Sequence, residues 1–319
     1  MTLAITTAVY RPGTALDEEL AGLGYAAMRG WPDQRPVTAA LVRSRLRPQG
    51  KTPPTIVFLM RSASGGLAAA AALRQPAGPA ASARLWGPAV APEWQRKGLG
   101  SALLKQATEC LPSRATVLTA EIPATRGHGC RMFERAGWRL YSAAALLKAR
   151  IIPDCDAPDD DQQPRVRPAD ASDAAALGRL YHAVHPEHGH DVAQDTYRRW
   201  AADERFVDDG LLVVDGSDGQ LQAAALVYPL IHSGCGEPPE ALLADVLMHP
   251  AADRTALTRP LITAALAAGT RHDAVVARAI VPTTAHDLLA RLQAAGMAME
   301  EEIRYYQAPA TPHTQGAAL

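Results

Sequence analysis

The same order of predicted helices and strands occurs twice in this chain, once on each side of a short polar segment. That segment, residues 153–164, reads PDCDAPDDDQQP and has too few apolar side chains to offset the entropy of ordering it. The chain has 319 residues, more than a single domain usually contains. The sequence therefore predicts two domains, residues 1–152 and 165–307, joined by a linker at 153–164 and followed by a disordered tail at 308–319.

The second predicted domain repeats the element order of the first. Apolar spacing and alternation predict, for the first domain, helices over residues 16–28, 37–46, 101–111 and 129–136, and strands over 55–60, 67–73, 83–91, 116–122 and 138–147. For the second domain, which opens with residues 165–168, they predict helices over 171–184, 260–268 and 286–294, and strands over 210–214, 220–229, 243–248, 274–281 and 298–306. This repetition indicates an internal duplication at the scale of a domain.

Composition excludes several classes of protein. The 32 Lys and Arg against 33 Asp and Glu give a net charge of −1, which argues against a nucleic-acid partner or an anionic membrane surface. Apolar runs fall well short of the roughly 20 residues that cross a bilayer. The N-terminal residues MTLAITTAVYRPG lack the features of a secretory signal, so a cytoplasmic location is expected. Four cysteines without a CxxC pair predict reduced thiols.

The most informative segment, residues 90–103, reads VAPEWQRKGLGSAL and connects a predicted strand to a predicted helix. Two glycines permit tight turns there, and the helix N-terminus directs several backbone N–H groups and its positive dipole end at one point. Arg96 and Lys97 add cationic side chains beside that point. These features predict a phosphate site, and the charge suits a pyrophosphate better than a single carboxylate.

This segment resembles the Q/R-x-x-G-x-G/A loop of the GNAT-type N-acetyltransferases, with Gln95, Gly98 and Gly100 at the three defining positions. Residues 132–138, MFERAGW, are similar to the late helix-to-strand signature of that family. The resemblance implies a fold of the α/β (α+β) class with two GNAT-like domains. Each would be a mixed, splayed, mostly antiparallel sheet flanked by helices. It also implies that acetyl-CoA lies between two diverging strands.

The resemblance further implies which residues hold acetyl-CoA. Backbone groups near Pro88, which itself has no N–H, would contact pantetheine, while the loop would hold the pyrophosphate. Arg126 stands where the family commonly has an asparagine. The implied cofactor-binding residues are Ala89, Val90, Ala91, Gln95, Arg96, Lys97, Gly98, Leu99, Gly100, Ser101 and Arg126.

The second domain lacks the chemistry of this loop. Ala256 and Thr258 stand where the glycines would be, so their Cβ atoms would crowd the phosphates, and Asp253 would repel them. We therefore interpret the second domain as an inactive copy that closes the acceptor cleft or forms a dimer contact, and we expect a homodimer as one arrangement of the protein.

The catalytic groups that the family often uses are missing. The strand before the loop carries no carboxylate, and Phe133 stands at the usual tyrosine position. Glu121 and His128 are the candidate catalytic residues, because both titrate usefully and follow the strand expected near the thioester. An ordinary surface role remains the alternative for each. Cys130 is expected to be a small core residue.

The acceptor region is less clearly marked. Tyr25, Trp31 and Asp33 are the candidate substrate-binding residues, since a Trp and an Asp could hold a cationic amine; a solvated helix end explains them equally well. Farther along, four histidines at 182, 185, 188 and 190 form a dense group. A polar loop after a helix, which by analogy would face an acceptor site, is favoured over a metal site because two of the histidines lie beyond a proline.

The predicted function is transfer of an acetyl group from acetyl-CoA to an amine of a small molecule, such as an antibiotic, a biosynthetic intermediate or an amino sugar. One alternative is acetylation of a protein or peptide amine. Another is a catalytically weak protein that only binds acetyl-CoA or a ligand. Tandem members of the family also include mycothiol-synthesising enzymes, but there the resemblance implies an intact loop in the second half, unlike here.

Overall fold

The computed structural model describes residues 3–29, 37–47, 53–75, 82–111, 117–151, 164–203, 205–216, 219–230 and 239–309. These residues form two compact units. The first is built mainly from Met1–Ala143 and Ile303–Leu319, and the second from Ala144–His232 and Gly236–Glu302. The predicted linker up to residue 163 and the predicted tail from residue 310 lie outside the described residues. Among the described helices, none has both the length and the apolar character needed to cross a bilayer.

The first unit is a mixed sheet in the order β1-β2-β3-β4-β5-β12, in which β4 and β5 are parallel and the other pairs antiparallel. Its strands are β1 (Ile5–Val9), β2 (Ile56–Arg61), β3 (Leu67–Arg74), β4 (Ser82–Val90), β5 (Val117–Pro123) and, at its outer edge, part of β12 (Ala298–Gln307). Its helices are α1 (Ala15–Ala27), α2 (Ala39–Leu46), α3 (Leu99–Glu109) and α4 (Gly127–Arg135).

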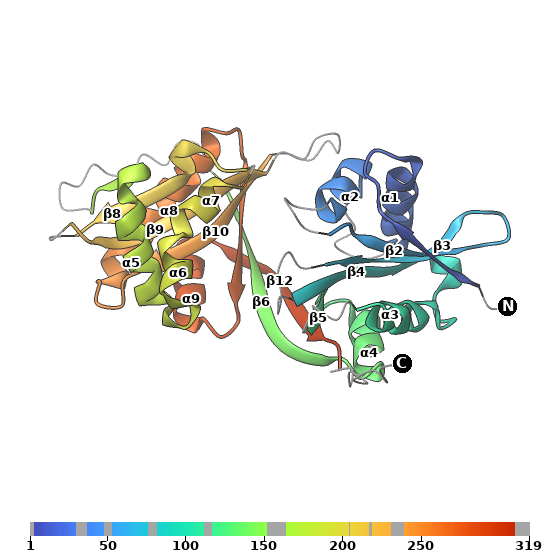
Figure 1. Cartoon of the computed structure of the whole chain (residues 1–319). Helices are drawn as coiled ribbons and strands as arrows, with labels where there is room; N and C mark the ends of the chain where they lie inside the picture. The colour runs from blue at the N-terminus through green and yellow to red at the C-terminus, as the bar shows by residue number, and fades with distance from the viewer. Residues whose placement is uncertain are drawn as a thin grey trace. The chain divides into compact units, whose positions relative to one another are not determined.

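Helices cover both faces of this sheet because its central strands are apolar on both sides. Along β3, Ala69, Ala71 and Leu73 belong to the core under α3 and α4. The alternate residues Ala70 and Ala72 belong to the core under α1 and α2. Figure 1 shows the two pairs of helices on opposite sides of the strands. The structure therefore confirms the predicted class, a mixed and mostly antiparallel sheet flanked by helices.

The second unit has the corresponding sheet order, β6-β11-β10-β9-β8-β7, with β10 and β11 parallel. Its strands are β6 (Arg139–Arg150), β7 (Val166–Pro168), β8 (Leu211–Asp215), β9 (Leu221–Leu230), β10 (Glu240–Met248) and β11 (Val276–Pro282). Its helices are α5 (Ala174–Val184), α6 (Gly189–Gln194), α7 (Thr196–Ala201), α8 (Arg254–Thr270) and α9 (His286–Ala294). One core lies under α5 and another under α8 and α9.

The two sequence halves exchange their final strands. Residues 303–307 of β12 pair antiparallel with β5 in the first unit, as the red strand in Figure 1 shows. Residues 144–150 of β6 pair antiparallel with β11 in the second unit. Each unit is thus completed by a strand from the other half of the sequence, so that the compact units and the sequence halves contain different residues.

The ends of α4 and α9 show the duplication in local geometry. Gly137 and Gly296 follow these helices with φ of 79° and 94°, the left-handed region that favours glycine. The next residue in each case returns its N–H to the helix, Trp138 to the carbonyl of Phe133 and Met297 to that of Leu292. Trp138 and Met297 are both buried. The matching A-G-aromatic/Met pattern in the sequence therefore encodes the same helix end twice.

Several predicted boundaries are wrong. The helix predicted over 260–268 begins at Arg254, because the Asp253 side chain caps it there, and Pro260 lies inside it. Strand β1 and helices α6 and α7 were not predicted. The histidine-rich segment, expected to be a polar loop, is a 3-10 turn at Pro186–His188 followed by α6. Short elements with few apolar residues give too weak a periodicity to be recognised from sequence.

Candidate active site

Strands β4 and β5 separate partway along their length. Their parallel pairing covers residues 82–85 and 117–120, and among the described residues no strand pairs with this edge of β4 beyond Leu85. An irregularity in the pairing with β3 coincides with Gly87, which has φ of 83°. A Cβ there would lie 2.9 Å from the amide nitrogen of Ala89 and 3.2 Å from the carbonyl oxygen of Ala70, so only glycine fits. The free edge of β4 offers backbone hydrogen-bonding groups to a ligand.

The segment after β4 connects this strand to the N-terminus of α3, which is open. A 3-10 turn, Pro92–Trp94, is followed by Gln95, whose side-chain amide donates to the carbonyl of Val90 at 3.1 Å. Gly98, with φ of 81°, is the N-cap of α3, and no side chain caps the helix. The first backbone N–H groups of α3 are therefore not satisfied by a capping side chain, which is the arrangement that binds anions.

The two loop glycines have different roles. Gly98 supplies the left-handed turn, whereas Gly100 is buried inside the first turn of α3. A Cβ on Gly100 would lie 2.5 Å from Met132 Sδ on α4, so this glycine permits close packing rather than a turn. Leu99 is buried beside it and Ser101 is exposed.

Two cationic residues belong to the loop, and a third precedes α4. Arg96 adopts a left-handed φ of 61°, and both Arg96 and Lys97 are exposed. The Lys97 ammonium lies 4.6 Å above the ring of Trp94. Arg126 is buried and immediately precedes α4. The two loop cations, Arg96 and Lys97, place positive charge beside the open helix end, which suits a diphosphate.

The corresponding place in the second unit is closed. Strands β10 and β11 also separate, since their pairing covers only residues 240–243 and 276–279. Helix α8, however, is capped by Asp253, whose Oδ1 accepts the N–H groups of Thr255 and Ala256 at 2.9 and 3.2 Å. The Thr258 hydroxyl donates to the carbonyl of Arg254 at 2.6 Å. A carboxylate of the protein itself thus takes the hydrogen bonds that a phosphate would need.

Glu121 lies just beyond the point where β4 and β5 separate. Its neighbours Ala120 and Ile122 pack into the core under α3 and α4, so Glu121 points to the opposite face of the sheet. There it forms a hydrogen-bonded ion pair with Arg84. Both side chains are partly exposed, at 34% and 47%. Glu121 can therefore reach a ligand on this face, provided that Arg84 releases the carboxylate.

His128 lies elsewhere. It is exposed on α4, which covers the other face of the sheet, and its Nδ1 accepts a hydrogen bond of 2.8 Å from Arg131. The structure thus places the two candidate bases on opposite faces. Cys130 is buried among the core residues under α3 and α4.

Two tyrosines that the sequence did not mark join this region through the exchanged strand β12. Tyr305 is the register partner of Glu121, so the two side chains share a face. Burial, and then the charge of Glu121, raise the pKa of Tyr305. Tyr306 points to the other face, where it stacks on Phe133 with ring centroids 5.2 Å apart and donates to Glu134 at 2.9 Å. No local pattern shows that these residues belong to the first unit.

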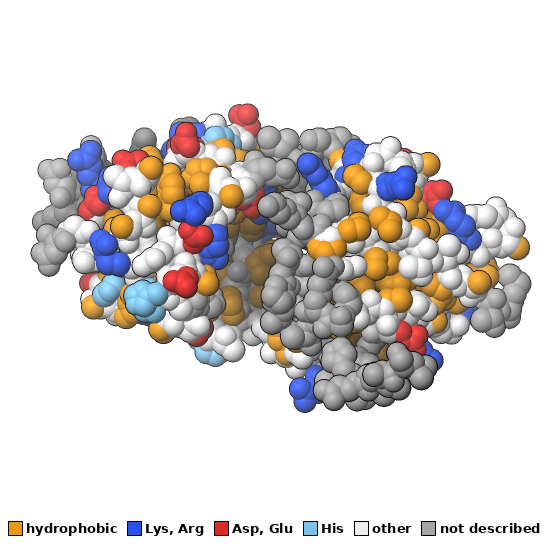
Figure 2. All heavy atoms as spheres, viewed as in Figure 1, with side chains coloured by type: hydrophobic (Ala, Val, Ile, Leu, Met, Phe, Trp, Pro, Cys, Tyr) orange, Lys and Arg blue, Asp and Glu red, His pale blue; other side chains and the backbone are white. Residues whose placement is uncertain are grey.

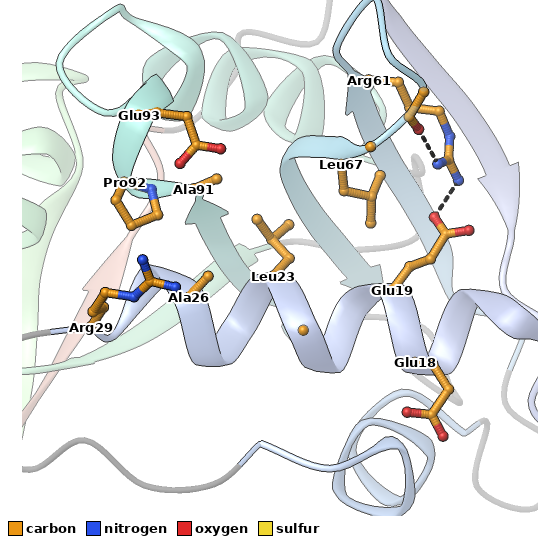
Figure 3. A pocket seen from close by; sticks show the side chains of 13 residues that line it. Glu18, Glu19, Leu23, Ala26, Arg29, Arg61, Leu67, Ala91, Pro92 and Glu93 are labelled. Carbon is orange, nitrogen blue, oxygen red and sulfur yellow. Dashed lines mark hydrogen bonds and ion pairs between the residues drawn. The ribbon is translucent and has the colours of Figure 1, made fainter.

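The candidate acceptor residues are only partly described. Tyr25 is 47% exposed on α1, while Trp31 and Asp33 lie outside the described residues. A cavity of about 570 Å³ lies between α1, the β2–β3 turn and the start of the phosphate loop. Figure 3 shows Glu19 of α1 joined to Arg61 of β2, and Arg29, just after the end of α1, below Pro92 in this view. Neither Glu121 nor Tyr25 lines this cavity, so the cavity is separate from the acyl-transfer candidates.

The histidine group of the second unit contains stacked rings. His182 and His190 have ring centroids 4.1 Å apart. Within the described ranges, no group of three or more His, Cys, Asp or Glu side chains is arranged to hold a metal ion. On the face shown in Figure 2, acidic and basic side chains are mixed among the described residues, as expected for a chain of net charge −1.

Comparison with known proteins agrees with this geometry. Residues 17–138 match the model of the acetyltransferase (GNAT) family. This part of the chain is therefore a GNAT acetyltransferase domain, from a family of enzymes that use acyl-CoA donors. No curated protein sequence matches the chain.

Solved structures share the fold of the whole chain. A tandem GNAT protein from the clavulanic acid biosynthesis pathway is 20% identical with a TM-score of 0.74, covering 97% of this chain and 99% of its own. A GCN5-related N-acetyltransferase from Sphaerobacter thermophilus is 16% identical with a TM-score of 0.73, covering 97% and 98%. Saccharomyces cerevisiae N-myristoyltransferase with bound myristoyl-CoA is 12% identical with a TM-score of 0.59, covering 97% and 79%. At these identities the similarity shows the fold alone, a tandem GNAT arrangement.

Proposed function

We propose that this protein transfers an acetyl group from acetyl-CoA to an amine of a small molecule, and that the first unit alone binds the donor. The observation that carries the proposal is the uncapped N-terminus of α3 at the end of the free edge of β4. An anion can occupy the helix end while an extended chain pairs with the strand edge. The combination suits a nucleotide diphosphate that bears a pantetheine arm.

The donor residues divide by position. Backbone groups of Ala89, Val90 and Ala91 pair with the pantetheine amides, although Gln95 already occupies the carbonyl of Val90 and Ala68 accepts the N–H of Ala91. The N–H groups around Gly98 hold the pyrophosphate, and nearby cations balance its charge. Further residues proposed for this diphosphate site are Arg96, Lys97, Leu99, Gly100, Ser101 and Arg126.

Glu121 is the proposed proton acceptor. The amine nitrogen attacks the thioester carbonyl, its proton passes to Glu121, and the C–S bond breaks to leave the thiolate of CoA. Glu121 is suited to this role because it follows the separation of β4 and β5 directly, where the thioester end of the donor is expected. Tyr305, on the same face as Glu121, supplies a proton to the departing thiolate.

We propose that the second unit is an inactive copy that closes the acceptor cleft or forms a dimer contact. Its support is the Asp253 cap, which places negative charge at the helix end where a phosphate would bind. The cytoplasmic location, the homodimer and the domain boundaries at residues 152 and 165 stay predictions.

The experiment is acetyl-CoA-dependent release of free thiol with a panel of small amines, peptides and proteins. Turnover with small amines supports the proposal. Turnover restricted to peptides or proteins supports the alternative acceptor class. Tight binding of acetyl-CoA without thiol release from any acceptor would indicate a binding protein, a reading favoured by Phe133 and by the engagement of Glu121 with Arg84.

A further inference from the structure

Three arginines gather on the face of the first unit that carries Glu121. Arg74 and Arg84 are direct register partners on the antiparallel strands β3 and β4. Their neighbours Leu73 and Leu85 point into the core under α3 and α4, so both arginines point to the face opposite that core. Burial first, and then the charges of Arg84 and Arg45, lower the pKa of Arg74, which places the α2 residue Arg45 near this pair.

This cluster has more positive than negative charge. Glu121 pairs with Arg84, and Arg43, on the same helix as Arg45, pairs with Asp17. Within the described part of the first unit, no carboxylate lies at ion-pair distance from Arg74. Like charges directly opposite each other on a sheet are destabilising. The protein tolerates this repulsion beside its acyl-transfer candidates, where an anionic ligand would relieve it.

The donor phosphates do not explain the arginines. Arg84 precedes Val90 by six residues on β4, and a strand rises about 3.3 Å per residue. The arginines therefore lie about 20 Å along the strand from the start of the phosphate loop. They lie instead at the end where β4 still pairs with β5, next to Glu121.

We propose that the amine acceptor carries an anionic group, a carboxylate or a phosphate, which Arg74 and Arg84 bind. This inference rests on the proposed acetyl transfer and specifies its substrate class. The anion competes with Glu121 for Arg84. Its binding therefore frees the Glu121 carboxylate to accept the amine proton, and the base becomes available only when an acceptor is present.

The test compares matched amines that differ in the anionic group. Glucosamine and glucosamine 6-phosphate form one pair, and glycylglycinamide and glycylglycine form the other. For each amine, thiol release gives kcat and KM, and calorimetry in the presence of CoA gives Kd. We expect the anionic member of at least one pair to have a KM and Kd about 10- to 100-fold lower, as for a hydrogen bond to a charged group. The pair that shows this difference identifies phosphate or carboxylate.

Arginine variants locate the effect. R74Q and R84Q remove the preference for the anionic member, whereas the control R61Q on β2, which breaks an exposed ion pair with Glu19, keeps it. R74Q raises KM for the anionic member far more than for the neutral member, a split that a general loss of folding would not produce. R74K keeps the charge and retains part of the preference. Melting temperatures confirm that the variants are folded.

Equal KM and Kd for both members of both pairs overturn the inference, even if thiol release shows that acetyl transfer itself occurs. A preference that survives in R74Q and R84Q also overturns it. If no amine releases thiol but the anionic members bind in an arginine-dependent manner, the inference stands and the proposed function fails for these acceptors. If there is neither turnover nor differential binding, both are wrong.

Discussion

A carboxylate placed at the N-cap of α3 should weaken donor binding by about two orders of magnitude, because Asp253 occupies the equivalent helix end in the second unit. In α8, Asp253 accepts two amide N–H groups at 2.9 and 3.2 Å. Gly98→Asp would place a similar side chain on the uncapped α3. Asn and Asp both tolerate the left-handed backbone better than most residues, so Gly98→Asn is a control of equal shape without the charge.

The expected magnitude follows from charge and distance. A unit charge about 4 Å from a phosphate charge costs about 1 kcal/mol in water and about 4 kcal/mol at an effective dielectric constant of 20. An intermediate cost of ~2.7 kcal/mol corresponds to about 100-fold weaker binding of acetyl-CoA than in the wild type. The Asn variant should lose much less, and should bind at least about tenfold more tightly than the Asp variant.

Isothermal titration calorimetry measures both the affinity and the stoichiometry. We expect one acetyl-CoA per chain in the wild type, and no change in that affinity on replacing Thr258 in the second unit by Ser. Equal affinities for the Asp and Asn variants would refute the role of the α3 N-terminus. A stoichiometry of two would refute the assignment of a single donor site.

Three further predictions follow from the positions of other residues. Glu121→Gln should lower kcat by roughly 10²- to 10⁴-fold with little change in acetyl-CoA affinity, whereas His128→Ala, on the opposite face, should keep the wild-type rate; a wild-type kcat for both variants would leave positioning and solvent as the only catalysts. Ending the chain at residue 302 should destroy the first unit and its donor binding by removing the buried Tyr306, while ending it at residue 309 should preserve both, as judged by circular dichroism and calorimetry. The hydrogen bonds from Arg167 lower the pKa of Asp173 below its ordinary 3.8, so Asp173→Asn should lower the melting temperature near neutral pH. This stabilisation is present above about pH 4 and is lost as the pH falls through the lowered pKa, so the difference in melting temperature between variant and wild type should shrink in acid. A difference that stays constant with pH would contradict the assignment.

Local chemistry made the glycine turn and the start of α3 predictable. Two glycines, a glutamine and two cations at fixed spacing lie between an apolar strand and an apolar helix stripe, and each feature acts on its own backbone neighbourhood. The role of Gly100 was not predictable in this way. Its spacing was recognised, but the reason for it is the thioether of Met132 on another helix, a contact that only the packed structure contains.

The choice between Glu121 and His128 also depended on packing. Glu121 lies in β5 and His128 lies in α4 directly after it, so their separation along the chain is small. Strand alternation sends Glu121 to one face, and α4 carries His128 over the other. The ion pair with Arg84 joins residues 37 positions apart, which no local pattern could indicate.

The sequence by itself determined the duplication, the class of the fold and the position of the glycine-containing loop before α3, because these depend on periodicity and on residue types within a few positions of each other. Only the tertiary structure decided that the last strands change places, so that Tyr305 and Tyr306 serve the first unit. Strands β6 and β12 each follow the same kind of helix end, so the local sequence does not distinguish pairing with β5 from pairing with β11. Which pairing forms depends on the free energy of packing residues more than a hundred positions apart, and that quantity is not written in any local segment.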